Sequence, residues 1–172
     1  YAELANLYMS MLQMRLISVT EAFPKIFHTT RKALAIDPDH DQANLVMAFM
    51  SWFEWDWKAS EKGFLKVLET NPNHVLANAF YAHYLMLTGR NQLALNCGRK
   101  AVELDPMNDL ALSLYGVVLL HSSGQIEKAF EVAKESIEIN PQSILTLRLL
   151  EQASYPKGDL ETSVQMLALV YS

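Results

Sequence analysis

The five histidines are the side chains in this 172-residue chain best suited to metal or acid–base chemistry. No pair has the His-Glu-x-x-His spacing that places two ligands on one face of a helix. His83 and His121 fall in separate predicted helices that can lie side by side, so a transition-metal site between them, serving a metal-dependent enzyme, is one alternative. The other alternative is that these two imidazoles are buried or line a groove. The full set is His28, His40, His74, His83 and His121.

The densest group of carboxylates is the run 37–41, in which Asp37, Asp39 and Asp41 alternate as they do in a calcium loop. The run lacks the glycine turn and the later bidentate Glu that such a loop needs. Asp39 and Asp41 are instead placed to cap a following helix through their side-chain oxygens. We therefore expect no metal to be bound here.

Cys97 is the single cysteine, and it falls inside a predicted helix without an adjacent base. A thiol in that setting is more typical of apolar packing than of a nucleophile. The sequence also lacks a glycine-rich phosphate loop. We therefore expect no catalytic residue, no cofactor and no resident metal, so that the chain is not an enzyme.

The composition is that of a folded chain with a substantial core, since 51% of the residues are hydrophobic. The formal net charge of −5 lacks the basic footprint of a nucleic-acid binder, so we expect no binding of DNA or RNA. Apolar runs such as 114–120 are far shorter than the roughly 18 residues that cross a bilayer, so no membrane association is expected. One unpaired cysteine suits the cytoplasm. The start at Tyr1 suggests a fragment of a longer protein.

Four prolines recur at spacings of 34, 34 and 35 residues, each preceded by Asp or Asn. A period of this length predicts an all-α stack of about four to five helix pairs, in which each unit contacts its neighbours. The prolines are Pro38, Pro72, Pro106 and Pro141. The predicted helix pairs are 2–17 with 21–36, 41–54 with 57–70, 75–88 with 91–104, 109–122 with 125–139, and 143–154 with 159–171.

Residue types at fixed places in the period support this helix-turn-helix unit. Small residues recur twelve before the later prolines, at Ser60, Ala94 and Ala129, where they allow close helix approach. Glycines at 89, 124 and 158 suit a left-handed helix end, whereas Trp55 stands at that place in the first full unit, so a different turn is expected there, surrounded by the aromatic residues 52, 53 and 57.

Helix starts can also be predicted. Asp56, Asn91 and Asp159 are expected to cap the helices that follow the turns. Because proline is tolerated only in the first turn of a helix, the helix that contains Pro24 is expected to begin between Thr20 and Phe23.

This pattern resembles the tetratricopeptide repeat, most closely over residues 75–108, with Tyr81-Ala82, Gly89, Ala94, Ala101 and Asp105-Pro106. The resemblance implies a right-handed α–α superhelix over a single array, 1–172, with units at 41–74, 75–108 and 109–141 and degenerate ends at 1–40 and 142–172. The run Trp55-Asp56-Trp57, followed by Phe64, is similar to the repeat region of bacterial multidomain signalling proteins. A regulatory or recruiting role is what that likeness implies.

The resemblance further implies that the first helices of the pairs line a concave groove, which would accept a protein or peptide. Residues three and four apart on those helices share a face, and this face is apolar with two imidazoles. Such a groove is either open to an apolar peptide or amphipathic helix, or covered within the intact protein. The predicted groove residues are Leu45, Phe49, Trp52, Ala79, His83, Met86, Ser113, Val117, Leu120 and His121.

A second hypothesis assigns the chain to dimerisation. The last predicted helix is rich in apolar residues, among them Val164 and Leu167, and lacks a polar outer face. Terminal repeats without such a face need to be covered. The alternative to peptide binding is therefore a homodimer that forms through the terminal repeats.

Overall fold

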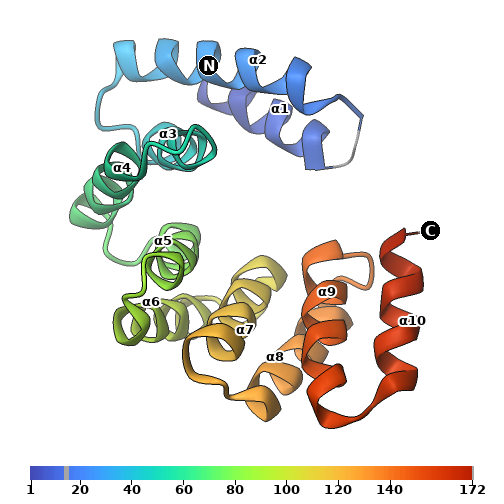
Figure 1. Cartoon of the computed structure of the whole chain (residues 1–172). Helices are drawn as coiled ribbons and strands as arrows, with labels where there is room; N and C mark the ends of the chain where they lie inside the picture. The colour runs from blue at the N-terminus through green and yellow to red at the C-terminus, as the bar shows by residue number, and fades with distance from the viewer. Residues whose placement is uncertain (14–15, 172) are drawn as a thin grey trace. The chain divides into compact units, whose positions relative to one another are not determined.

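The computed structural model describes residues 1–13 and 16–171, with the side chains of Gln13 and Tyr171 left undescribed. Within these ranges the chain is all-α and its helices form sequential antiparallel pairs, as predicted (Figure 1). The elements are α1 (Ala2–Gln13), α2 (Val19–Ile36), α3 (Asp41–Phe53), α4 (Trp57–Thr70), α5 (Val75–Leu87), α6 (Asn91–Leu104), α7 (Asp109–Ser123), α8 (Ile126–Ile139), α9 (Ile144–Ser154), the 3-10 helix η1 (Tyr155–Lys157) and α10 (Leu160–Tyr171).

The predicted helix limits from residue 41 onward all agree with the structure to within one residue. The predicted helix 2–17 runs over residues 14 and 15, which lie outside the described residues. α2 begins at Val19, one residue before the predicted interval, and the argument behind that interval is wrong, because Pro24 lies in the second turn of the helix and not in the first. Ser18 makes the earlier start possible, since its hydroxyl accepts a hydrogen bond from the backbone N–H of Glu21 at 3.2 Å. No described helix combines the length and apolar character that a membrane span requires.

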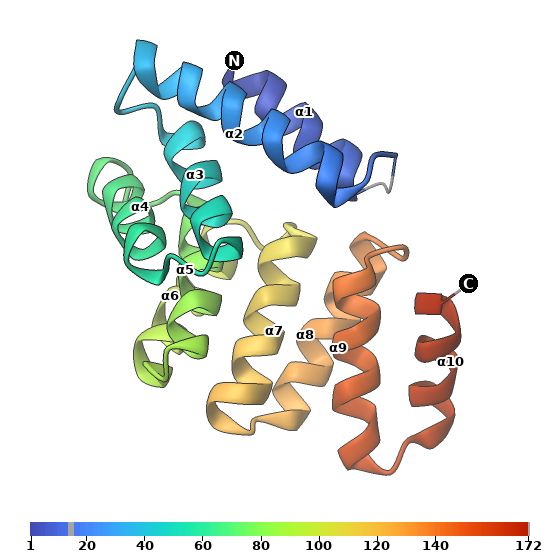
Figure 2. The same ribbon diagram turned by 45° about the horizontal axis from the view of Figure 1, so that its top comes forward.

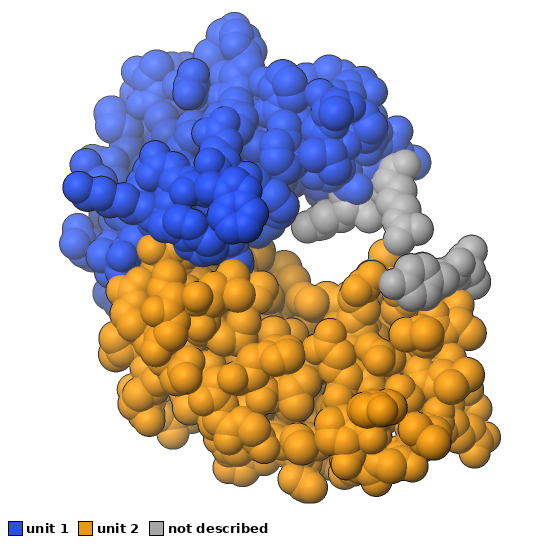
Figure 3. Space-filling model, viewed as in Figure 1, with its two compact units in different colours: residues 1–72 blue, residues 73–172 orange. Residues whose placement is uncertain are grey.

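The chain divides into two compact units, residues 1–72 and residues 73 onward (Figure 3). Unit 1 contains α1–α4 and unit 2 contains α5–α10. The boundary follows Pro72, one of the four periodic prolines. It lies two residues before the predicted junction of repeats 41–74 and 75–108.

The core of unit 1 depends on small residues where α3 and α4 cross. A Cβ atom on Gly63 would lie 2.7 Å from the Cβ of Ala48, so the two backbones approach too closely for a larger residue. Ile26 of α2 and Met50 of α3 are fully buried in a second contact that joins the two helix pairs. Burial of apolar side chains of this size is the main source of stability in such a unit.

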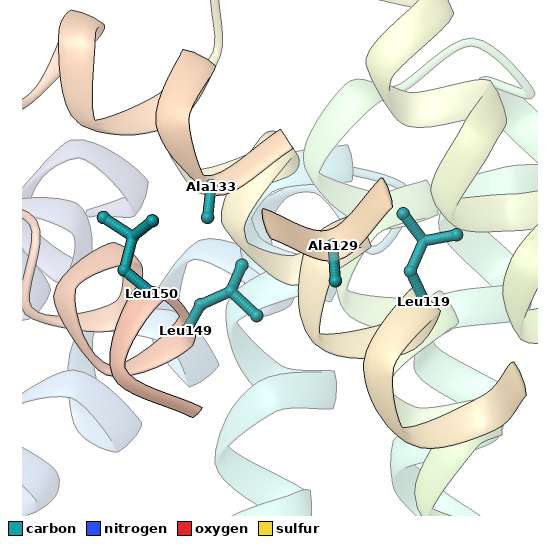
Figure 4. Close-up of a cluster of buried hydrophobic side chains, with 5 residues drawn as sticks. All are labelled: Leu119, Ala129, Ala133, Leu149 and Leu150. Carbon is teal, nitrogen blue, oxygen red and sulfur yellow. The ribbon is translucent and has the colours of Figure 1, made fainter. Parts of the chain in front are cut away.

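Unit 2 repeats the same packing along its length. The first helices α5, α7 and α9 follow one another, with α6 packed against α7 and α8 against α9 (Figures 1 and 2). Gly98 makes room for the ring of Tyr115, and Gly116 makes room for Leu149. Figure 4 shows one cluster of this core, in which side chains of α7, α8 and α9 meet at Leu119, Ala129, Ala133, Leu149 and Leu150.

Three buried hydroxyls also join helices of unit 2. Ser113 of α7, Ser136 of α8 and Thr146 of α9 lie within 2.6 to 3.0 Å of one another and are fully buried. Ser136 also donates to the backbone carbonyl of Asp109 at 2.9 Å. Buried hydroxyls need such partners, and here the partners come from three different helices.

Two of the predicted helix caps are confirmed. Asp56 accepts from the N–H of Ala59 at 3.0 Å, and Asp159 accepts from the N–H of Thr162 at 3.1 Å. The Thr162 side chain, first, and its backbone N–H, second, lower the pKa of the Asp159 carboxyl, because both hydrogen bonds favour the charged form. The prediction for Asn91 is wrong, since this residue is the first of α6 and the capping position holds Arg90, whose side chain makes no cap.

The capping role predicted for Asp39 and Asp41 is also wrong. His40 occupies the cap of α3, and its Nδ1 accepts from the N–H of Ala43 at 3.4 Å. The carboxylate of Asp37 accepts from the N–H of Asp39 at 3.1 Å and so closes the turn around Pro38. A short side chain that bonds its own backbone two residues later is the usual way to build such a turn.

Candidate protein-binding surfaces

Three of the predicted groove residues belong to the core and not to a surface. Leu45 is 2% exposed, and Ala79 and Ser113 are fully buried. They occupy equivalent positions in α3, α5 and α7, and α5 and α7 pack against each other. The prediction that these three residues line the groove is therefore wrong. Part of the helix face that the spacing assigned to the groove is buried in the core.

The other predicted residues of unit 2 lie at its surface, on the adjacent helices α5 and α7. Four of them are half-buried and His121 is exposed. We call this set the α5–α7 surface: His83, Met86, Val117, Leu120 and His121. His121 extends it towards α9, because its Nε2 lies 3.2 Å from Oε1 of Gln152. Gln152 was not among the predicted groove residues, although it holds in α9 the place that Val117 holds in α7, 35 residues earlier, because the predicted groove ended at the third helix pair.

His83 contributes little charge to the α5–α7 surface. Its pKa is lowered to about 4, first because burial penalises the charged imidazolium and second because His121 repels a positive charge. The imidazole is therefore neutral at pH 7. The surface is an apolar area with two nitrogen heterocycles and no carboxylate or ammonium group among its five members.

In unit 1 the two remaining predicted residues, Phe49 and Trp52, belong to a row of aromatic rings. Phe49 contacts Phe53 with ring centroids 4.9 Å apart, and Trp52 lies 6.1 Å from Phe49. The row continues to Trp57 of α4, 6.3 Å from Trp52. The two contacts of Phe49 are edge-on, and the contact between Trp52 and Trp57 is tilted at 46°. Edge-on contacts at these separations are favourable for aromatic pairs, so the row stabilises the end of the α3–α4 pair.

The turn at Trp55 is not different from the glycine turns, contrary to prediction. Its φ of 62° equals that of Gly124 and lies near those of Gly89 and Gly158. The backbone bonds also agree, because Asp56 N–H donates to Ser51 O as Arg90 N–H donates to Leu85 O, at 2.9 and 2.8 Å. A bulky side chain in this left-handed conformation costs about 1–3 kcal/mol.

The geometry offers little for catalysis. Across the described ranges, no group of three or more His, Cys, Asp or Glu side chains is arranged to hold a metal ion. Burial raises the pKa of the Cys97 thiol, with Lys100 opposing the effect, so the reactive thiolate is disfavoured at neutral pH. The alternative of an enzyme that uses His83 and His121 therefore lacks a complete ligand set among the described residues.

Antiparallel helix pairs at a 34-residue period, packed through small residues, define the tetratricopeptide-repeat (TPR) fold, and solved structures agree with this assignment. A thermophilic TPR protein of Thermus thermophilus matches with a TM-score of 0.80 at 12% identity, over 98% of this chain and 88% of that one. PilW, a type IV pilus biogenesis factor, matches with a TM-score of 0.75 at 19% identity, over 98% of this chain and 76% of that one.

YrrB, a TPR protein with an unusual peptide-binding site, matches with a TM-score of 0.59 at 20% identity, over 96% of this chain and 80% of that one. No model of a known protein family matches this sequence. No curated protein matches it either. The comparisons therefore show the fold.

Proposed function

We propose that this chain is a non-catalytic scaffold that binds a peptide or an amphipathic helix of another protein on the α5–α7 surface. The observation that carries the proposal is the composition of that surface: Met86, Val117 and Leu120 are held half-buried on two adjacent helices without a charged neighbour in the set. Apolar anchors at helical spacing are what an amphipathic segment requires of its binding site. Met86 adds an adaptable contact.

The fold supports this role, and so does the peptide-binding site of YrrB. The wider setting proposed is a recruiting segment of a larger bacterial signalling protein in the cytoplasm. The signalling setting rests on the resemblance of residues 55–57, and the compartment rests on the single unpaired cysteine. In unit 1, Phe49 and Trp52 offer a second apolar contact of the same kind. The poor nucleophilicity of Cys97 supports a role without catalysis.

A selected peptide tests the α5–α7 surface. Twelve-residue peptides selected from a random display library on the whole chain supply the probe, and calorimetry measures the dissociation constant. Met86→Glu is expected to weaken binding at least tenfold, because it places a charge in an apolar contact. Leu93→Glu is the matched control, since Leu93 is exposed on α6. An unchanged dissociation constant for Met86→Glu, with unchanged circular dichroism, would remove the surface from consideration.

A second candidate function, homodimerisation, is supported by the face of α10. Val164 and Leu167 lie 34 residues after Phe130 and Ala133, which α8 packs against α9. In α10 the same two positions are 66% and 46% exposed, and Leu160 beside them is also exposed. An apolar stripe of this kind needs a cover, and a second α10 in antiparallel orientation provides one.

The charges of α10 permit such a pair. Glu161 is the single charged residue of the helix. In an antiparallel pair centred between Val164 and Leu167, the two Glu161 side chains would be roughly 13 Å apart along the axis, beyond the Debye length of about 8 Å.

Light scattering after gel filtration tests this function. It should show a dimer that Leu167→Glu converts to a monomer, whereas Met107→Glu at another exposed apolar site leaves the dimer intact. A monomer across micromolar concentrations contradicts this function.

A further inference from the structure

Trp55 combines two unfavourable features. It is a bulky residue in the left-handed backbone conformation, and its side chain is 76% exposed. The fold does not need an indole there, because Gly89 and Gly158 make turns with the same conformation. Backbone strain that the fold does not require points to a function.

Aromatic residues next to Trp55 determine which part of its ring is accessible. Its ring meets that of Trp57 nearly edge-on, with centroids 5.8 Å apart and planes at 71°. Phe53 beside it is half exposed. One indole face is therefore presented at the surface next to a second ring, which is the geometry that accepts a flat group by stacking.

The residues on either side of Trp55 in the sequence are negatively charged. Glu54 and Asp56 flank Trp55, and both are exposed. One oxygen of Asp56 caps α4, whereas no hydrogen bond or ion pair to the Glu54 carboxylate is found within residues 1–13 and 16–171. The surface therefore pairs an electron-rich ring with a negative charge.

We propose that Trp55 and Glu54 form a docking site for an arginine side chain in a basic segment of a partner protein. The guanidinium group stacks on the indole face and its N–H groups donate to the carboxylate, two interactions that one planar cation makes at once. The flanking carboxylates disfavour an anionic lipid surface as the ligand. This site uses residues other than those of the α5–α7 surface and does not depend on that surface binding a peptide.

The test uses the whole chain and an acetylated tetra-arginine amide. Nitrogen–proton spectra resolve indole N–H signals, and the signal that disappears in Trp55→Gly identifies Trp55. Titration with tetra-arginine is expected to shift that signal, and Trp55→Gly is expected to weaken binding at least tenfold, or about 1.4 kcal/mol. Glu54→Gln should weaken it roughly threefold and reduce its dependence on salt. Met107→Ala, at an exposed apolar residue, is the control.

Thermal unfolding of the same variants completes the test. Trp55→Gly is expected to keep or raise the melting temperature, because glycine removes the strain. A lower melting temperature would make Trp55 a packing residue and overturn the proposal. Equal binding of a tetra-citrulline peptide, which lacks the charge, would also overturn it, as would a Trp55 signal that shifts only with vesicles of phosphatidylcholine and phosphatidylserine.

Discussion

The hydroxyl of Ser113 in α7 lies 2.6 Å from that of Thr146 in α9, and both side chains are fully buried. Ser136 of α8 is the third member of this group, and it donates its proton to the carbonyl of Asp109. The Ser113 and Thr146 protons are then left to bond within the triangle. Each hydroxyl thus depends on side chains from the other two helices, so the group fixes how α7, α8 and α9 are aligned.

Thr146→Val is expected to destabilise the chain by about 1–3 kcal/mol. Valine keeps the volume of threonine but leaves Ser113 and Ser136 with one buried partner fewer. Chemical denaturation measures the change. Thr88→Val is the comparison, because Thr88 is an exposed residue at the end of α5 whose hydroxyl donates to the Tyr84 carbonyl and accepts from Nε of Arg90, so water can replace both partners. It should change stability by less than about 1 kcal/mol. Equal effects of the two variants would show that the three buried hydroxyls contribute nothing to the stability of the chain.

Ser60→Ala is expected to stabilise unit 1 by roughly 1 kcal/mol. The Ser60 side chain is fully buried, and its Oγ has no hydrogen-bond partner among the described residues. Removing a buried hydroxyl without a partner removes a desolvation cost, and alanine also favours the helix. The equivalent positions of unit 2 already hold Ala94 and Ala129. A lower midpoint of unfolding for the variant would contradict this account.

Gly63→Ala is expected to destabilise the chain by about 1–2 kcal/mol, although alanine is the better helix former. The new methyl group would lie 2.7 Å from the Cβ of Ala48, which cannot rotate away, so α3 and α4 must move apart. This cost exceeds the gain of about 1 kcal/mol in helix propensity. Denaturation is again the measurement. An increase in stability would mean that the two helices separate at no cost.

Most of the fold can be predicted from the sequence because the period fixes it. Small residues at constant distances from each proline identify the close helix contacts, and Ala94 and Ala129 indeed lie there fully buried. The start of α2 could not be predicted from the restriction on Pro24 alone. Ser18 caps the helix, and Ala22 and Ile26 are fully buried on either side of Pro24, so the cap and this packing together offset the missing hydrogen bond inside the helix.

The candidate sites could be predicted only in part, because helical spacing gives a direction but not the depth of a side chain. Ala79 and His83 share a face of α5, yet the first is buried and the second reaches the surface. Packing of α7 against α5 decides this difference. The conformation of Trp55 was likewise beyond local rules, which exclude bulky residues from a left-handed turn.

His83 makes the stability of the chain depend on pH between about 4 and 6.5. Its pKa is lowered to about 4 in the folded chain from the ordinary value of 6.5, so the unfolded chain binds more protons in that interval. The contribution of His83 to the free energy of unfolding is therefore complete above pH 6.5 and is lost as the pH falls towards 4. His83→Gln removes this contribution, and its midpoint of unfolding should fall less than that of the unmodified chain between pH 7 and pH 4. His28→Gln, at an exposed histidine of α2, is the control. Parallel pH profiles for the unmodified chain and His83→Gln would mean that the imidazole is hydrated and charged in the folded state, and the neutral character of the α5–α7 surface would then fail with it.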